Sequence, residues 1–298
     1  MNDNNKRGFK RKTIEQTIKH KIAGWLKTIN DEDLRRDVKS HYILTGGAIA
    51  SMLQGDLPND YDIYFDDSSV AARLAKYYLK QLVGEKYSDF ADVIESEDRV
   101  EVKIFDKGVL DKFDAVEGTE NKGRYRVSMI TSNAITLTNE IQLVLRFVGD
   151  ASQIHKNYDF VHATNYFSQN TDLVLHPAAL ESILSKELKY VGSLYPVCSL
   201  FRIKKFIKRG WNITAGEMFK IIYDASQLDL QNYEVLEDQL TGVDTSYFAR
   251  MIELLRMDGR PLERGYLFEV INKVFDEARE DEAIEEETET EKQKIASI

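Results

Sequence analysis

A glycine pair followed by two aspartates constrains this chain more than any other feature of its sequence. Gly46-Gly47 follows a short apolar run, and the residues after it have the composition of a helix opening. Residues 60–65 then alternate in side-chain character, which predicts a strand. Because side chains alternate along a strand, Asp60 and Asp62 share one of its faces. The segment therefore predicts a strand, a glycine turn, a helix and a second strand in succession.

The two aspartates and the glycine turn have complementary chemistry. Two carboxylates held close together on a rigid strand repel each other unless a cation lies between them. Mg²⁺ suits this position, because it prefers oxygen ligands and is commonly held by one or two carboxylates together with substrate phosphates. Glycine lets a ligand approach the backbone, and a helix N-terminus attracts phosphate. The segment thus predicts a site for a metal-bound triphosphate. The alternative is an ordinary turn with two solvated aspartates.

The segment LTGGAIASMLQGDLPNDYDIYF, residues 44–65, resembles the signature of the DNA polymerase beta-type nucleotidyltransferase superfamily. The segments NAITLTNEIQLVLRF and HKNYDFVHATNYF also resemble nucleotidyltransferase-like proteins of tailed bacteriophages. The resemblance covers roughly residues 41–213. It implies that Asp60 and Asp62 are paired metal ligands and catalytic residues, and that Gly46-Gly47 is the phosphate-binding turn.

The same resemblance implies a third catalytic and metal-ligating carboxylate on a later strand. Asp159 is one candidate, in a strand that we expect over residues 158–163, and Asp150 in a turn is the other. We choose Asp159, because a rigid strand places a ligand better than a turn does. His162 falls on the opposite face of that strand and is expected to be structural. Arg146, in an apolar strand, either joins the nucleotide site by pairing with a carboxylate or lies on an exposed face.

The segment PVCSLFRIKKFIKRGW, which begins at Pro196, is the most basic stretch of the ordered body. At helical spacing it has an apolar stripe made of Leu200, Ile203, Phe206 and Ile207. Arg202 and Lys205 stand on another side and are candidates for binding nucleotide phosphates or an RNA backbone. The segment is loosely similar to the arginine-bearing helix after the catalytic core of CCA-adding enzymes and poly(A) polymerases. The alternative is a solvated basic face.

Patterning divides the chain into four parts and predicts an α+β fold with a helical C-terminal domain. The expected parts are N-terminal helices over 1–40, a catalytic domain with a small mixed or antiparallel sheet flanked by helices over 41–176, a helical domain over 177–278, and an acidic disordered tail over 279–298. Ten acidic and three basic residues give residues 276–298 a charge of −7, so the body carries only −3 of the net −10. This balance disfavours avid non-specific DNA binding but allows a local basic groove.

Composition restricts the class of protein further. Among 298 residues the chain has a single cysteine, Cys198, which excludes an internal disulfide framework and fits a reducing compartment. No apolar run approaches the roughly 20 residues of a membrane span, and the basic N-terminal residues have no apolar region of a secretory signal after them. We expect a cytoplasmic protein without a membrane partner, in the host cytoplasm if the chain is phage-encoded.

The motif and the resemblance lead to one functional hypothesis with two alternatives. The chain would transfer a nucleoside monophosphate from ATP or another nucleoside triphosphate to an acceptor hydroxyl, using two Mg²⁺ ions and releasing pyrophosphate. We prefer an RNA 3′ end over a protein or small-molecule acceptor, because the basic segment offers more cationic surface than a small acceptor needs. The alternatives are a toxin-like nucleotidyltransferase and a catalytically inactive fold that serves as a binding or virion structural protein.

Overall fold

The computed structural model describes residues 7–105 and 124–240, together with residues 265 and 269. These residues belong to two compact units. The first comprises the described residues up to Ser193 and those of 210–217, and the second comprises 194–209 and the described residues from Met218 onward. The acidic tail and the end of the predicted helical domain lie outside the described residues, so those expectations stay predictions.

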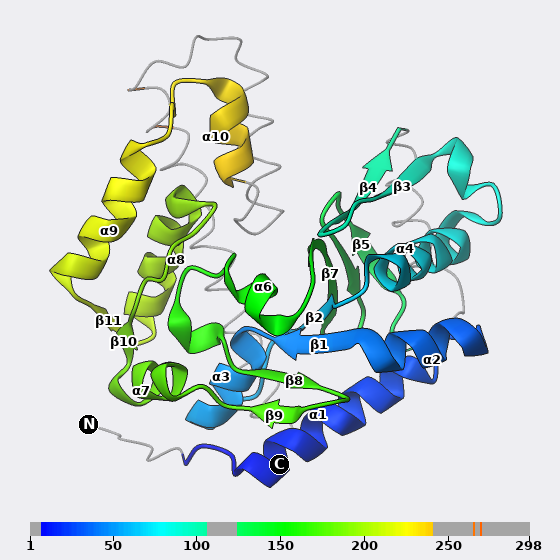
Figure 1. The fold of residues 1–298 in the computed structure, drawn as a ribbon, viewed down its shortest axis with the longest axis horizontal. Helices are drawn as coiled ribbons and strands as arrows, with labels where there is room; N and C mark the ends of the chain where they lie inside the picture. Colours follow the sequence, from blue (N-terminus) through cyan, green and yellow to red (C-terminus); the bar gives the residue numbers. More distant parts are fainter. Residues whose placement is uncertain (1–6, 106–123, 241–264, 266–268, 270–298) are drawn as a thin grey trace, which may run out of the picture. The chain divides into compact units, whose positions relative to one another are not determined.

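A seven-stranded mixed sheet is the centre of the first unit (Figure 1), with the strand order β5-β6-β7-β2-β1-β8-β9. Its strands are β1 (Tyr42–Thr45), β2 (Tyr61–Phe65), β5 (Val127–Ile130), β6 (Ala134–Leu137), β7 (Ile141–Val148), β8 (Tyr166–Ser168) and β9 (Asp172–Val174). β2 and β7 run parallel, and the other neighbours run antiparallel. The predicted mixed sheet with flanking helices is therefore confirmed.

The remaining elements of the first unit are helices and two strand pairs. The helices are α1 (Arg11–Leu26), α2 (Glu32–His41), α3 (Gly47–Gln54), α4 (Ser68–Val83), α6 (Ala151–His155) and α7 (Pro177–Ser185), with 3-10 helices η1 (Tyr87–Asp89) and η2 (Val161–Ala163). The strands β3 (Ala91–Glu95) and β4 (Val100–Ile104) pair antiparallel, and β10 (Glu187–Leu188) pairs parallel with β11 (Asn212–Ile213). The second unit contains α8 (Pro196–Lys208) and α10 (Tyr233–Leu240), and α9 (Ala215–Ser226) begins in the first unit and continues into the second.

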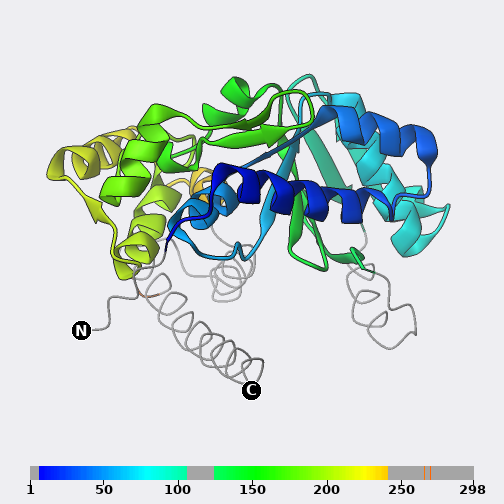
Figure 2. The ribbon, with the colours of Figure 1, turned by 90° about the horizontal axis from the view of Figure 1, so that it is seen from below.

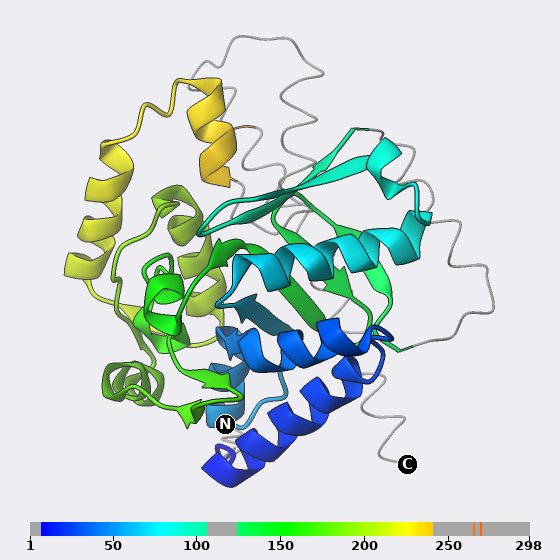
Figure 3. The same ribbon diagram turned by 45° about the vertical axis from the view of Figure 1, so that its right-hand side comes forward.

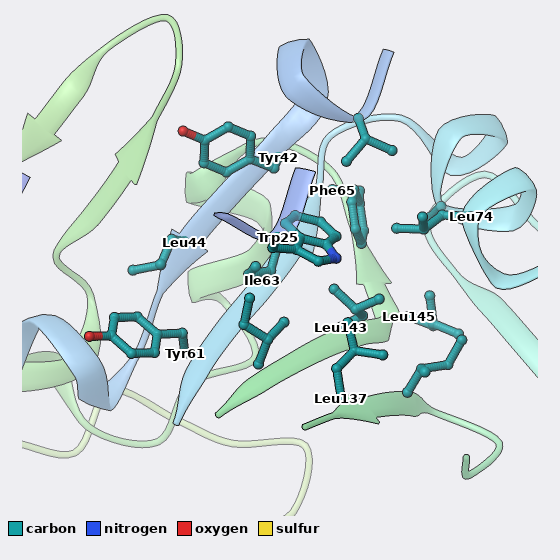
Figure 4. Packing of buried hydrophobic residues seen from close by; sticks show 14 of the residues in the cluster. Trp25, Tyr42, Leu44, Tyr61, Ile63, Phe65, Leu74, Leu137, Leu143 and Leu145 are labelled. Atoms are coloured by element: carbon teal, nitrogen blue, oxygen red, sulfur yellow. The ribbon is translucent and has the colours of Figure 1, made fainter. Parts of the chain in front are cut away.

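Alternation along β1 and β2 gives the sheet two different faces. Side chains that include Leu44, Ile63 and Phe65 pack in a large apolar core with α1, α2 and α4 (Figure 4). Figure 3 shows these three helices in front of the sheet, and Figure 2 shows α1 extending along it. Within the core, Trp25 donates a hydrogen bond of 2.8 Å from Nε1 to the hydroxyl of Tyr78, which satisfies both buried polar groups. The opposite face of β1 and β2 carries the polar residues of the predicted site.

The start of α4 depends on an N-cap. The side chain of Asp67 accepts hydrogen bonds from the backbone N–H groups of Ser69 and Val70, at 2.8 and 3.1 Å. The Ser69 hydroxyl also donates to Asp67 and is the largest cause of its lowered pKa. We expect Asp67→Ala to lower the free energy of unfolding by about 1 kcal/mol, because helix N–H groups lose their acceptor. Urea denaturation at pH 7 measures this change, and a loss of only about 0.2 kcal/mol or less would contradict it.

The strand predicted over residues 158–163 is wrong. Asp159 lies in a bend, and a 3-10 helix covers Val161–Ala163. Only one isolated bridge, from Phe160 to Tyr190, joins this segment to another part of the described chain in strand fashion. Of the aromatic residues that suggested a strand, Phe160 and His162 are buried, so their pattern reflects burial and not strand pairing. The helical expectation from residue 177 onward also needs a correction, because β10 and β11 lie within that range.

None of the helices in the described ranges is both long enough and apolar enough to cross a lipid bilayer.

Candidate functional site

The predicted glycine turn and the second predicted aspartate meet beside the end of β1. Antiparallel pairing of β1 with β2 sets Leu44 opposite Ile63, which brings Asp62 next to the turn that follows β1. Gly46 has φ 97° and ψ −151°, a conformation that is essentially restricted to glycine. A methyl group placed on Gly46 would lie 3.1 Å from Oδ2 of Asp62. The structure thus brings Gly46 and Asp62 together.

Gly47 and Asp60, the other two residues of the motif, are close in the sequence to Gly46 and Asp62, respectively. Gly47 is the first residue of α3, and no described atom lies within 4 Å of the position that its methyl group would occupy. The first N–H groups of a helix have no acceptor within the helix, so this end of α3 can bind an anion. Asp60 is exposed and directly precedes β2, while Asp62 is half-buried within it. Open space at a helix N-terminus therefore adjoins a carboxylate.

A buried threonine and a neutral histidine hold the turn in place. The hydroxyl of Thr45 has one proton, which it donates to the carbonyl oxygen of Asn165 at 3.0 Å. Nε2 of His155 lies 2.8 Å from the same hydroxyl and must therefore be the donor of that hydrogen bond. Burial, followed by the neighbouring His176, lowers the pKa of His155 to about 4. At neutral pH His155 is therefore an uncharged donor that fixes the residue before Gly46.

Five aromatic rings form a contiguous set on this face of the sheet, which we call the ring cluster: Tyr64, His155, Tyr158, Tyr166 and His176. Tyr158 is the member next to the glycine turn, because its hydroxyl would lie 3.5 Å from a methyl group on Gly46. Sequence reasoning missed this cluster. Its members come from β2, the end of α6, the segment after α6, β8 and the residue before α7, and the pairing of β1 with β8 sets Tyr166 beside Thr45.

Asp159 is buried, with only 8% of its surface exposed. Its charge opposes the lowering of the pKa of His162 that burial causes. In the part of the chain that the structure describes, no three His, Cys, Asp or Glu side chains form a group that could hold a metal ion. The structure therefore does not gather Asp159 with Asp60 and Asp62. Its role as a third ligand stays a prediction.

His162 is buried as expected for a structural histidine, with 4% of its surface exposed and its ring centroid 4.7 Å from that of Trp211. Burial lowers its pKa to about 4, although Asp159 acts in the opposite direction. The unfolded chain takes up this proton near pH 6.5, so stability is lost as the pH falls from about 6.5 to about 4.

We expect His162→Gln to reduce the loss of unfolding free energy between pH 7 and pH 5 by about 2 kcal/mol, because the buried neutral imidazole is removed. Urea denaturation of both proteins at the two pH values measures this difference. An unchanged pH dependence in the variant would contradict the assignment, whatever the variant's stability at pH 7.

Arg146 is a half-buried residue near the end of β7. The register of β7 with β2 shifts between Leu143 and Val148, so strand alternation alone does not assign Arg146 to the face that carries Asp62. Its guanidinium carbon is 5.7 Å from the centroid of the Phe147 ring. Its part in nucleotide binding stays a prediction.

The basic segment forms α8, but its apolar stripe is only partly as predicted. Ile203 is buried, whereas Leu200 and Ile207 have 37% and 52% of their surfaces exposed. The buried positions at the start of α8 are Pro196, Val197, Cys198 and Ser199 instead. Arg202 is half-buried and Lys205 is exposed, both in the second unit. Their proposed phosphate contacts stay predictions.

Solved structures similar to this chain include two of CCA-adding enzymes. The Thermotoga maritima enzyme complexed with tRNA_CCA has a TM-score of 0.39 and 11% sequence identity, covering 78% of this chain and 53% of its own. A CCA-adding enzyme in apo form I has a TM-score of 0.41 and 11% identity, covering 80% of this chain and 51% of its own. Both scores are below 0.5.

Sequence comparison gives a closer relationship. The protein Gabija anti-defense 2 of Bacillus phage SPbetaL7 is 23% identical over 243 residues, which are 80% of this chain and 50% of that protein. The chain thus spans about half the length of this curated relative. The family described as Gabija anti-defense 2 family protein matches residues 16–186, which is more than half of the chain. This chain belongs to the Gabija anti-defense 2 family.

Proposed function

We propose that this chain is a metal-dependent nucleotidyltransferase with its site at Gly46-Gly47 and Asp62. The observation that carries the proposal is the 3.1 Å between Oδ2 of Asp62 and a methyl position on Gly46, beside the open N-terminus of α3. A carboxylate in this place would repel a bare phosphate. A cation between carboxylate and phosphate removes that repulsion, so the combination favours a metal-bound polyphosphate.

The side chains present fit a magnesium site. Asp62 on β2 and the exposed Asp60 before it offer only oxygen ligands, which Mg²⁺ prefers. Their two carboxylates would hold the metal, and the turn at Gly46 would bind the phosphates. When bound, divalent ions supply charge neutralisation to the triphosphate and activate the acceptor hydroxyl.

The proposed reaction is the transfer of a nucleoside monophosphate. A bond forms between the acceptor oxygen and the α-phosphorus, and the bond from the α-phosphorus to the oxygen that bridges to the β-phosphate breaks. Pyrophosphate leaves, and the acceptor's proton passes to solvent. In this scheme the chain contributes position and charge, which account for most of the catalysis in phosphoryl transfer generally.

An RNA acceptor is supported by the surface of α8. Lys204, Lys205 and Lys208 are exposed there, and Arg209 follows them. This row presents more positive charge than a small acceptor would use, and Lys and Arg side chains are the usual contacts to nucleic-acid phosphates. Because the chain belongs to an anti-defence family, we further propose that the transferred nucleotide is the means by which it counters the Gabija defence.

A second candidate is a protein that binds nucleotides without transferring them. The position of Asp159 favours it, because this carboxylate is buried beside His162 instead of in a group with Asp60 and Asp62. Such a protein could still hold one metal-bound triphosphate with the two aspartates of the motif.

Two measurements together separate the two candidates: label transfer and nucleotide binding. The full chain is incubated with Mg²⁺ and each α-³²P-labelled nucleoside triphosphate, together with total RNA and protein of a bacterial host. Label on RNA supports the RNA acceptor, and label on a polypeptide supports protein nucleotidylation. Binding of a nucleotide in calorimetry without label transfer would support the binding protein, and the absence of both would overturn the proposed site.

A further inference from the structure

The hydroxyl of Tyr158 is a buried polar group at the proposed site that the mechanism above does not use. It would lie 3.5 Å from a methyl group on Gly46, and Oδ2 of Asp62 would lie 3.1 Å from the same point. The hydroxyls of Tyr64 and Thr45 are near it, but no hydrogen bond of good geometry reaches it from the described residues. Two polar atoms from different segments therefore converge on the glycine turn, and the hydroxyl makes no hydrogen bond of good geometry with a described residue.

A buried hydroxyl without a partner lowers the stability of the folded chain, because it has lost its hydrogen bonds to water. Native proteins satisfy the great majority of such groups, and exceptions commonly mark a position that a ligand or an ion completes. Phenylalanine would fill the same space as Tyr158 without this cost. The hydroxyl thus indicates a bound group that the phenol can contact.

The chemistry of that group follows from the phenol's neighbours. A tyrosine hydroxyl is protonated at neutral pH and has one O–H group to donate. A donor aimed at a phosphate-binding turn suits an anionic oxygen, and hydrogen bonds to charged acceptors are the stronger kind.

We propose that the hydroxyl of Tyr158 donates a hydrogen bond to a phosphate oxygen of the nucleotide bound at Gly46-Gly47. This inference rests on the proposed function and adds a phosphate-binding residue from outside the sequence motif. Because the contact is to phosphate, it is independent of the base.

The rest of the ring cluster holds Tyr158 ready for this contact. Its ring centroid lies 5.2 Å from that of His155 and 6.1 Å from that of Tyr64. Its backbone N–H donates to the carbonyl oxygen of His155 at 3.1 Å. His155 is itself fixed by its hydrogen bond to Thr45, the residue before the turn. A side chain that is ordered before binding loses little entropy on binding, which favours affinity.

The test uses Tyr158→Phe, which removes only the hydroxyl, and inorganic tripolyphosphate with Mg²⁺ as the probe. Titration calorimetry is expected to show tight binding to the wild-type full chain and a Kd about tenfold higher for Tyr158→Phe. Without ligand, the Tm of this variant is expected to equal or exceed that of the wild type. The matched control is Tyr166→Phe, which alters another ring of the cluster, and its Kd should stay within about twofold of the wild type.

A lowered Tm of Tyr158→Phe combined with an unchanged Kd would show a merely structural hydroxyl and overturn the inference. Equal losses of affinity in both variants would do the same, because the effect would then belong to the cluster and not to this hydroxyl. If the wild type binds neither tripolyphosphate nor any nucleoside triphosphate, the proposed function fails together with the inference. Wild-type binding that Tyr158→Phe leaves unchanged removes the inference alone.

Discussion

Replacing Asp62 with asparagine is expected to lower kcat/KM for nucleotide transfer by about a thousandfold, because the charge that holds the metal against the phosphates is lost. The amide keeps the size and shape of the side chain next to Gly46. Asp62 is half-buried on β2, and asparagine fills the same space, so unfolding should be nearly unaffected. We expect a change in Tm of about 2 °C or less, which corresponds to less than about 1 kcal/mol.

The matched control for this variant is Asp66→Asn. Asp66 is exposed just beyond the same strand, and it contacts Nδ1 of His41 at 2.7 Å, away from the glycine turn. Transfer of the α-³²P label measures both variants under identical conditions. Full activity of Asp62→Asn would contradict the site, and an equal loss in Asp66→Asn would point to a non-specific effect of lost charge.

Substitution of the two glycines is expected to have different consequences at neighbouring positions. Gly46→Ala forces an L-residue into φ 97° and ψ −151° and sets its methyl group 3.1 Å from Oδ2 of Asp62. We expect a loss of about 2 kcal/mol in unfolding free energy, a fall in Tm of about 6 °C and a loss of transfer of at least a hundredfold. Backbone strain and the displaced carboxylate both contribute.

Gly47→Ala provides the contrast, because its methyl group meets no described atom within 4 Å and alanine is favoured in a helix. Its Tm should be unchanged or slightly higher. If the open space receives phosphate, the methyl group should nevertheless raise the Kd for Mg²⁺-tripolyphosphate about tenfold. Thermal unfolding and calorimetry measure the pair. Equal stability of the two variants would contradict the strained turn, and wild-type affinity of Gly47→Ala would contradict phosphate binding at this point.

The elements around the motif could be predicted from the sequence because their signals are local. Asp31 and Asp67 cap α2 and α4 as their positions indicate, and Gly55 ends α3 in the left-handed conformation with φ 87°. Alternation over β2 correctly placed Asp62 on the face opposite the apolar core. These outcomes depend on backbone hydrogen bonds within a few residues, so no knowledge of the tertiary fold is needed.

The rest depends on contacts between distant segments. In YDFVH, alternating aromatic residues suggested a strand, but the backbone bonds instead to residues 189–191: Val161 donates to the carbonyl oxygen of Lys189, and Val191 donates to that of Asp159. The strand geometry assumed for Asp159 and His162 was therefore wrong. Likewise, the contacts of Thr45 and His155 join residues 110 positions apart, and no local pattern indicates such a pair.

The placement of Tyr158 illustrates what the sequence leaves open at the site itself. The sequence predicted a site residue at the neighbouring Asp159, whereas the structure places the hydroxyl of Tyr158 near the glycine turn. Asp159, the next residue in the chain, lies in a bend and is buried. Motif spacing correctly indicated that Asp62 lies beside Gly46, but the orientation of the later segment depends on the tertiary fold.

A crystal structure of the full chain with Mg²⁺ and a non-hydrolysable nucleoside triphosphate would test the account most directly. We expect a metal ion bound by the Asp62 carboxylate, with phosphate oxygens at the N-terminus of α3 and within hydrogen-bonding distance of the Tyr158 hydroxyl. A nucleotide bound elsewhere on the chain, with Asp62 free of metal at millimolar Mg²⁺, would contradict it.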